Sequence, residues 1–233
     1  MIKNSILLCT KNEDKYIKET IISLNDSIPD LEIIVVDDNS SDNTVKIIKS
    51  LNSNYNIKLI ERFKSKGLGS AFLRAIVESN GSNIGWIDAN MSELCSKFPN
   101  MIEKLNNYDI VLLSRYIKGG GDERDALRVY SSKFLNFLCR IILDSRIKDY
   151  SSSIFIMKRD VLNEVSILGN GHGEFFIEFL YNAIKKSYKI LEVPYIQKND
   201  DNQNSKSFPN LFKFFTLGIF YLLRLMIIRI RRH

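Results

Sequence analysis

Two pairs of oxygen-bearing side chains follow apolar runs of the sequence and could bind a charged ligand. Asp37 and Asp38 come directly after a β-branched run, and Asp88 and Asn90 follow a second apolar run. Adjacent carboxylates repel one another, so they need a cation, an amide or a hydroxyl as a partner. An acid, a spacer and a second oxygen ligand can hold a divalent cation that bridges a nucleoside diphosphate. Both pairs therefore predict a site for an anionic ligand or its cation.

The elements that must position these residues alternate along the first half of the chain. Short β-branched runs predict strands that are covered on both faces, at Ser5–Cys9, Leu31–Val36, Ile57–Glu61, Ile84–Ile87 and Ile110–Leu113. The amphipathic segments between them predict helices at Lys15–Leu24, Thr44–Leu51, Gly67–Glu78 and Phe98–Leu105. This alternation predicts an α/β fold with a mostly parallel sheet. Ligands bind at the carboxyl ends of such strands, so the two acidic strand ends should share one edge.

The pattern changes after Ser114. Long helices are predicted at Asp125–Leu143 and Glu174–Lys186, with a strand at Lys189–Pro194 between the second helix and the tail. Residues 197–207 are polar and rich in Asn and Asp, which predicts a loop that could close over a ligand. We therefore expect one α/β domain over residues 1–207 and a separate hydrophobic, basic helix over residues 208–233.

The positive charge of the chain is concentrated in its last segment. The formal charge is +6, and residues 211–233 hold five Lys and Arg residues without an acid, which leaves +1 for residues 1–210. A basic tail on a nearly neutral domain argues against nucleic-acid binding and favours an anionic membrane surface. Lys213, Arg224 and Arg231 fall close to one stripe at 100° per residue, which favours a helix lying in the membrane interface. A spanning helix, or one packed on the domain or a partner, is the alternative.

The cysteines indicate the compartment. Cys9, Cys95 and Cys139 are scattered and have neither metal-binding spacing nor a pairing pattern, which favours a reducing environment. The first residues lead straight into a predicted strand, and no signal peptide is recognised. Together with the basic tail, this predicts a protein at the cytoplasmic face of a membrane, peripheral or anchored by a single helix.

Several motifs resemble those of the family-2 glycosyltransferases, and more closely their polyprenyl-phosphate branch, typified by dolichol-phosphate mannose synthase. The likeness runs from about Ser5 to Lys206 through LCTKNE, VVDDNSSDNT, KSKGLGSAFLRAI, IDANMS and LLSRYIKGGG. The pattern Arg128-x-x-x-Ser132-Lys133-x-x-Asn136 resembles the branch's Arg-x-x-x-Ser-Arg-x-x-Asn. The resemblance implies a GT-A fold, a nucleoside-diphosphate sugar as donor, and Mg²⁺ or Mn²⁺ as cofactor.

The resemblance also implies roles on the donor side of the site. Asp88 would take the metal and diphosphate role, with Asn90 as the second metal ligand, and Arg115 would face the donor. The remaining donor contacts would come from Glu13, Val35, Asp37, Ala89 and Lys206.

On the acceptor side, Arg128, Ser132 and Lys133 would hold the phosphate of a dolichyl or polyprenyl acceptor. Arg128 and Ser132 are four residues apart and share a helix face. A cation and a hydroxyl on one face can bind a phosphate monoester.

Three residues depart from the family pattern. Asn90 replaces an aspartate, Lys11 replaces an aromatic residue, and Asp200 stands where the branch has arginine. The predicted function is inverting transfer of a sugar, with mannose favoured, from a GDP- or UDP-linked donor to a polyprenyl phosphate. One alternative is a family-2 transferase that acts on a saccharide hydroxyl in surface polysaccharide synthesis, although that acceptor needs a general base. The other is a non-catalytic homologue that binds nucleotide sugars.

Overall fold

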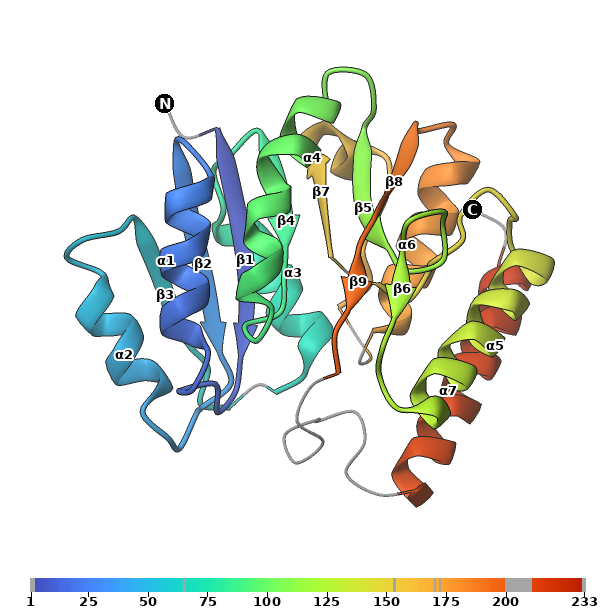
Figure 1. Ribbon diagram of the computed structural model, residues 1–233, viewed down its shortest axis with the longest axis horizontal. Helices are drawn as coiled ribbons and strands as arrows, with labels where there is room; N and C mark the ends of the chain where they lie inside the picture. The colour runs from blue at the N-terminus through green and yellow to red at the C-terminus, as the bar shows by residue number, and fades with distance from the viewer. Residues whose placement is uncertain are drawn as a thin grey trace.

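The computed structural model describes residues 3–64, 66–152, 154–169, 171, 173–199 and 211–231, with the backbone alone for residues 211–215 and 217. Its centre is a seven-stranded sheet in the order β3-β2-β1-β4-β7-β5-β8 (Figure 1). In chain order these strands are β1 (Asn4–Thr10), β2 (Leu31–Asp37), β3 (Ile57–Glu61), β4 (Asn83–Trp86), β5 (Ile110–Ser114), β7 (Phe155–Lys158) and β8 (Ile190–Pro194). A second, two-stranded sheet pairs β6 (Gly121–Asp122) with β9 (Ile196–Gln197).

The sheet is mostly parallel, as the alternating pattern predicts. β1 pairs in parallel with β2 and with β4, β2 pairs in parallel with β3, and β5 pairs in parallel with β8. The exception is β7, which lies antiparallel between β4 and β5. This strand was not predicted, because it lies outside the regular alternation of strand and helix in the first half of the chain.

Helices cover both faces of the sheet (Figure 1). Alternate residues of β1 and β2 face opposite sides, so Leu7 and Ile34 join one apolar core while Ile6 and Ile33 join the other. The helices are α1 (Ile17–Ser27), α2 (Thr44–Leu51), α3 (Leu68–Glu78), α4 (Phe98–Lys104), α5 (Ala126–Ile142), α6 (Glu174–Lys185) and α7 (Leu211–Ile230), with 3₁₀ helices η1 (Ser92–Lys97) and η2 (Arg159–Asn163).

Each core has its own set of helices. Residues of α1, α2 and α4 join the core that contains Ile6, and residues of α3 and α6 join the core that contains Leu7. Trp86 at the end of β4 stacks on Phe72 of α3 and on Phe175 of α6, with ring centroids 4.5 and 5.7 Å apart. Trp86 therefore has the core role that its apolar setting predicts, and it fixes the backbone that leads to Asp88.

The last helix packs on the domain with one face and exposes the other. Leu225 and Ile228 of α7 are fully buried in the core that includes α6. Arg224 and Arg231 do share one face of the helix, and both form ion pairs with the buried Glu178 of α6, at 2.6 and 3.1 Å. These two arginines are thus turned toward the domain, so the packing alternative holds for this face of the helix.

The outer face of α7 is apolar and lies beside α5 (Figure 1). We define the α5–α7 apolar face as the exposed side chains of Leu127, Tyr130, Phe134, Phe137, Ile141, Ile219, Phe220, Leu222, Leu223, Met226, Ile227 and Ile230. Among the described residues, no helix is both long enough and apolar enough to cross a bilayer.

Candidate active site

The two acidic strand ends lie at one edge of the sheet, because β1 separates β2 from β4 and all three run in parallel. Asp88 is partly exposed and Asn90 is exposed just after β4. Cys9 near the end of β1 lies between the two ends: its burial, and then the charges of Asp88 and Asp38, raise the pKa of its thiol well above the ordinary value. The structure therefore brings together the two pairs of residues that the sequence singled out.

Asp37 is fully buried at the end of β2. Its carboxylate accepts hydrogen bonds from the Thr10 hydroxyl at 2.9 Å, the Ser40 amide at 2.8 Å and the Ser40 hydroxyl at 2.5 Å. These bonds shape the turn that leads toward α2. Donor binding by Asp37 stays a prediction, and in this structure the carboxylate organises the loop at the site's floor.

Asp38 links the end of β2 to the start of α3. The carboxylate accepts a hydrogen bond from Nε of Arg62 at 2.6 Å and another from the amide of Gly67 at 2.8 Å. Gly67 has a φ of +119°, a conformation that side chains disfavour, so glycine suits this approach. The sequence analysis missed Arg62. Its signal was its position directly after β3, at the same edge of the sheet as the two aspartates.

Three further residues predicted on the donor side lie in β2 and after β1 and β4. The Glu13 amide donates to Thr44 Oγ1 at 2.7 Å, which ties the end of β1 to α2. The buried Ala89 accepts a hydrogen bond from Thr20 Oγ1 on its carbonyl at 2.6 Å. Val35 is fully buried inside β2, where its side chain packs in the core. Their predicted nucleotide contacts stay predictions. Lys206 and most of the predicted 197–207 loop lie outside the described residues.

Asp88 and Asn90 suit a cation only if a ligand completes its coordination. Among the described residues, no group of three or more His, Cys, Asp or Glu side chains is arranged to hold a metal ion. Mg²⁺, however, is usually held by one or two carboxylates together with waters and substrate phosphates. One partly exposed carboxylate and one exposed amide at a strand end fit that open kind of site.

The predicted acceptor residues lie on α5. Asp125 caps this helix by accepting a hydrogen bond from the Arg128 amide, and its carboxylate also pairs with Arg128 Nε at 3.0 Å. The Arg128 side chain is only 7% exposed. One turn further, Ser132 Oγ lies 3.2 Å from Ser151 Oγ. Arg128 and Ser132 are therefore held on the inner side of the helix by fixed partners, as a phosphate-binding pair requires.

Arg115 is buried directly behind these residues. Its guanidinium bonds both oxygens of Asp149, and Nη2 also donates to Ser151 Oγ at 2.7 Å. Burial alone would raise the pKa of Asp149, but the charge and hydrogen bonds of Arg115 outweigh burial and hold that pKa below its usual value. Asp149 was missed as a site residue. Arg115 connects to the acceptor side through Ser151, and its predicted contact with the donor stays a prediction.

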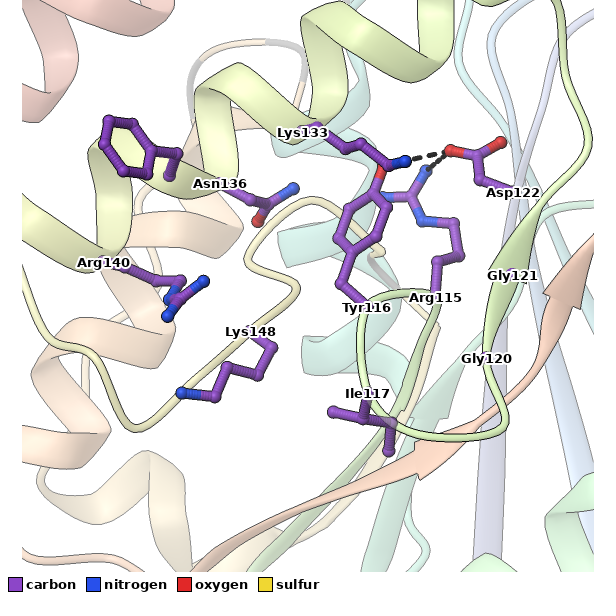
Figure 2. A pocket seen from close by; sticks show the side chains of 11 residues that line it. Arg115, Tyr116, Ile117, Gly120, Gly121, Asp122, Lys133, Asn136, Arg140 and Lys148 are labelled. Atoms are coloured by element: carbon purple, nitrogen blue, oxygen red, sulfur yellow. Dashed lines mark hydrogen bonds and ion pairs between the residues drawn. The ribbon is translucent and has the colours of Figure 1, made fainter.

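A cavity of about 440 Å³ opens between α5 and the loop after β5 (Figure 2). It is lined by Arg115, Tyr116, Ile117, Gly120, Gly121, Asp122, Lys133, Asn136, Phe137, Arg140 and Lys148. Lys133 therefore lies on the cavity side of α5, about 100° around the helix from Ser132. Arg128 and Ser132 lie on the inner side of α5, and Lys133 lines the cavity, so its predicted contact with the acceptor phosphate stays a prediction.

Known proteins resemble this chain in sequence or in fold. A dolichol-phosphate mannosyltransferase of Pyrococcus furiosus is 34% identical over 201 residues, which cover 83% of this chain and 56% of that protein. The Saccharomyces cerevisiae enzyme of the same name is 34% identical over 95 residues, 40% of this chain and 36% of the relative. The chain thus spans little more than half the length of the first relative.

Among solved structures, glucosyl-3-phosphoglycerate synthase from Mycobacterium tuberculosis, in complex with Mn²⁺, uridine diphosphate and glucosyl-3-phosphoglycerate, superposes with a TM-score of 0.75. It is 16% identical, and the match covers 99% of this chain and 81% of that one, which shows the GT-A-like fold. The model of the family "Glycosyl transferase family 2" matches residues 5–166. The chain therefore belongs to glycosyl transferase family 2.

Proposed function

We propose that this protein transfers a sugar from a nucleoside-diphosphate sugar to a polyprenyl or dolichyl phosphate, with inversion at the anomeric carbon. One observation carries the proposal: α5 presents Arg128 and Ser132 on its inner side and exposed apolar side chains on its outer side. A lipid phosphate has the same two parts, an anionic head and an apolar chain. The names of the curated relatives favour mannose as the sugar and dolichyl phosphate as the acceptor.

The reaction needs little acid–base chemistry from the protein. A phosphate monoester has a second pKa of about 6, so the acceptor is already an anion near neutral pH. One of its oxygens bonds to the anomeric carbon as the bond from that carbon to the donor diphosphate breaks, and the nucleoside diphosphate leaves. Catalysis then consists of positioning and electrostatic stabilisation. Arg128 and Ser132 would hold the attacking phosphate.

On the donor side, the residues at the ends of β1, β2 and β4 would bind the nucleotide. Asp88 and Asn90 would hold Mg²⁺ or Mn²⁺, which offsets negative charge on the donor diphosphate when it is bound. This assignment is supported by the open oxygen ligands at that strand end. The solved relatives are complexes with uridine diphosphate and Mn²⁺ or Mg²⁺. A transfer assay with GDP-sugars and UDP-sugars distinguishes a guanine donor from a uracil donor.

The α5–α7 apolar face would bring the enzyme to its lipid. An exposed apolar surface shared by two helices is a common mark of an interaction site. Arg140 of α5 is exposed and would meet anionic lipid headgroups. We therefore propose a peripheral enzyme on the cytoplasmic face of a membrane, with α5 and α7 lying in the interface.

A transfer assay tests the proposal. The purified protein would be incubated with Mg²⁺ or Mn²⁺, a short polyprenyl phosphate and labelled GDP- and UDP-sugars, one at a time. Label that moves into the organic phase with one donor supports the proposal and identifies the sugar. An Asp88→Ala protein is the control. Absence of transfer with every donor, while calorimetry still shows nucleotide binding, would contradict the proposed acceptor, and label on a water-soluble saccharide would favour a hydroxyl acceptor.

A further inference from the structure

Three cationic side chains gather at the cavity beside α5. Lys133 and Arg140 are seven residues apart and so share one face of the helix, and Lys148 approaches from the segment after α5. Figure 2 shows the side chains of Arg140 and Lys148 ending on the same side of the open space. Asn136 adds an amide between them. In the same view Lys133 ends on the other side of the space, near Asp122, so Arg140 and Lys148 are the two cations that share one side of the cavity.

The charge of these cations is not balanced locally. Asp122 is the acidic residue of the lining, and it is occupied by Arg124, Arg115 and the Tyr116 hydroxyl. Lys148 Nζ donates to the Ser145 carbonyl at 2.8 Å. Over the described parts of the chain, no carboxylate lies within ion-pair distance of Lys133, Arg140 or Lys148. A concave surface with three such cations favours an anion.

The apolar surroundings indicate what the anion carries. Phe137 lines the cavity and is 54% exposed, and it belongs to the α5–α7 apolar face. On the same helix, Phe134 and Ile141 are also exposed. An anion in the cavity would therefore have an apolar surface directly beside it. A lipid places a phosphate and hydrocarbon chains in this arrangement.

We propose that this cavity binds the phosphate headgroup of an anionic membrane lipid, through Arg140 and Lys148. The site adjoins the acceptor pair, because Ser151, which contacts Ser132, also accepts hydrogen bonds from Arg115 and Asn136 of the lining. Its two headgroup cations, Arg140 and Lys148, are different residues from Arg128 and Ser132. The lipid would be a fixed part of the docked enzyme and would set the depth and rotation of α5 at the membrane. The inference rests on the membrane part of the proposed function and does not depend on sugar transfer.

Vesicle binding tests this site without donor or acceptor. The full chain would be floated with vesicles of phosphatidylcholine alone or mixed with phosphatidylglycerol. We expect phosphatidylglycerol to strengthen binding, and Arg140→Gln or Lys148→Gln each to lose about fivefold of that gain. Arg146→Gln is the matched control, since Arg146 is a neighbouring, exposed cation that pairs with Asp144 outside the cavity. Arg140→Lys and Lys148→Arg should restore binding, which excludes misfolding as the cause.

Two results would overturn the proposal. If Arg146→Gln weakened binding as much as the two cavity variants, the attraction would be general and the cavity would have no special part. If inorganic phosphate bound the wild type and not the cavity variants, while vesicle binding was equal in all, the site would take a soluble phosphate. Binding to pure phosphatidylcholine measures the contribution of the apolar face alone, and the transfer assay measures catalysis. Failure of the headgroup proposal can therefore be distinguished from failure of the proposed function.

Discussion

Arg115 and Asp149 form a two-point ion pair inside the protein, with Nε and Nη2 of the arginine each 2.8 Å from one carboxylate oxygen. The pair joins the end of β5 to the segment that follows α5. The Asp149 carboxylate also accepts a hydrogen bond from Ser151, which contacts Ser132 on α5. One buried carboxylate therefore holds both the strand and the helix that form the acceptor side of the site.

Asp149→Asn should destabilise the protein strongly. The substitution leaves the Arg115 guanidinium buried without its main counter-charge, and breaking such a pair costs about 3–5 kcal/mol. Urea denaturation gives the change in the free energy of unfolding. Asp144→Asn is the control, because Asp144 pairs with the exposed Arg146 and its loss should cost less than about 1 kcal/mol. Equal losses in the two variants would refute the structural role given to the buried pair.

The same pair predicts how stability depends on pH. The pKa of Asp149 is held below the reference value of 3.8, and that of Asp122 is also lowered despite its burial. A carboxylate with a lowered pKa stabilises the fold above the unfolded-state value, and this contribution is lost as pH falls through the folded-state pKa. The free energy of unfolding should therefore fall steeply below about pH 3.8 in the wild type. The curve for Asp149→Asn should be flatter there, and parallel curves would contradict the linkage.

The metal assignment predicts opposite effects at its two ligands. Asp88→Ala should lower the rate of transfer by at least about 100-fold, since it removes the carboxylate. Asn90→Asp should lower the Mn²⁺ concentration needed for half-maximal activity, because a second carboxylate binds a hard cation more tightly than an amide. Asn107→Asp, at an exposed turn after α4, is the charge-matched control. A manganese titration that is identical in Asn90→Asp and Asn107→Asp would remove Asn90 from the site.

The acceptor assignment predicts a selective loss on α5. Arg128→Ala should lower kcat/KM for the lipid phosphate by about 10- to 100-fold, as expected for a hydrogen bond to a charged group, and Ser132→Ala should have a smaller effect. Donor binding, measured by calorimetry, should be unchanged. Ser131→Ala tests the face of the helix, since Ser131 neighbours Ser132 but points elsewhere by about 100°. If Ser131→Ala matched Ser132→Ala, the proposed phosphate-binding face would be wrong.

The apolar face predicts membrane binding that does not require anionic lipid. Ile141→Ser and Ile227→Ser should each weaken binding to phosphatidylcholine vesicles by about tenfold, because each removes an apolar side chain that would enter the interface. The stability of the free protein should hardly change, since both side chains are exposed. Val77→Ser on α3 removes a side chain that is 77% exposed on another helix and serves as the control. Unchanged vesicle binding in both test variants would show that the face meets something other than lipid.

The fold could be predicted further than the site. β-branched runs and amphipathic segments depend on local sequence, and they located every parallel strand of the large sheet. β7 could not be found this way, because its pairing with β4 and β5 is decided by tertiary contacts. The acidic strand ends were predicted from the sequence, because Asp37 and Asp38, and also Asp88 and Asn90, directly follow apolar runs. The pairings of Arg62 and Asp149 could not be predicted in this way, since each meets a residue 24 or 34 positions away; the position of Arg62 directly after β3 indicated only the edge of the sheet at which it lies.

The orientation of α7 illustrates the same limit. The apolar and basic residues of this segment are evident in the sequence, and both predict contact with a membrane surface. The partner of Arg224 and Arg231 is Glu178, a nearly fully buried acid within the apolar segment of α6. A buried carboxylate needs a cation, and that requirement was the signal that pointed to α7. The acid of α6 and the arginines of α7 together predict that these arginines face the domain and that the apolar residues on the other side of α7 face outward.

The position of β7 has a consequence for how the molecule assembles. β4 and β5 do not pair with each other in the sheet, and β7 joins both. The half that carries Asp88 and the half that carries α5 can therefore reach their final separation only when residues 155–158 insert between them. Insertion of a central strand after its neighbours depends on contacts that are distant in sequence, which makes such folding steps slow. The spacing between the donor side and the acceptor side is thus set by a strand that contributes no predicted site residue.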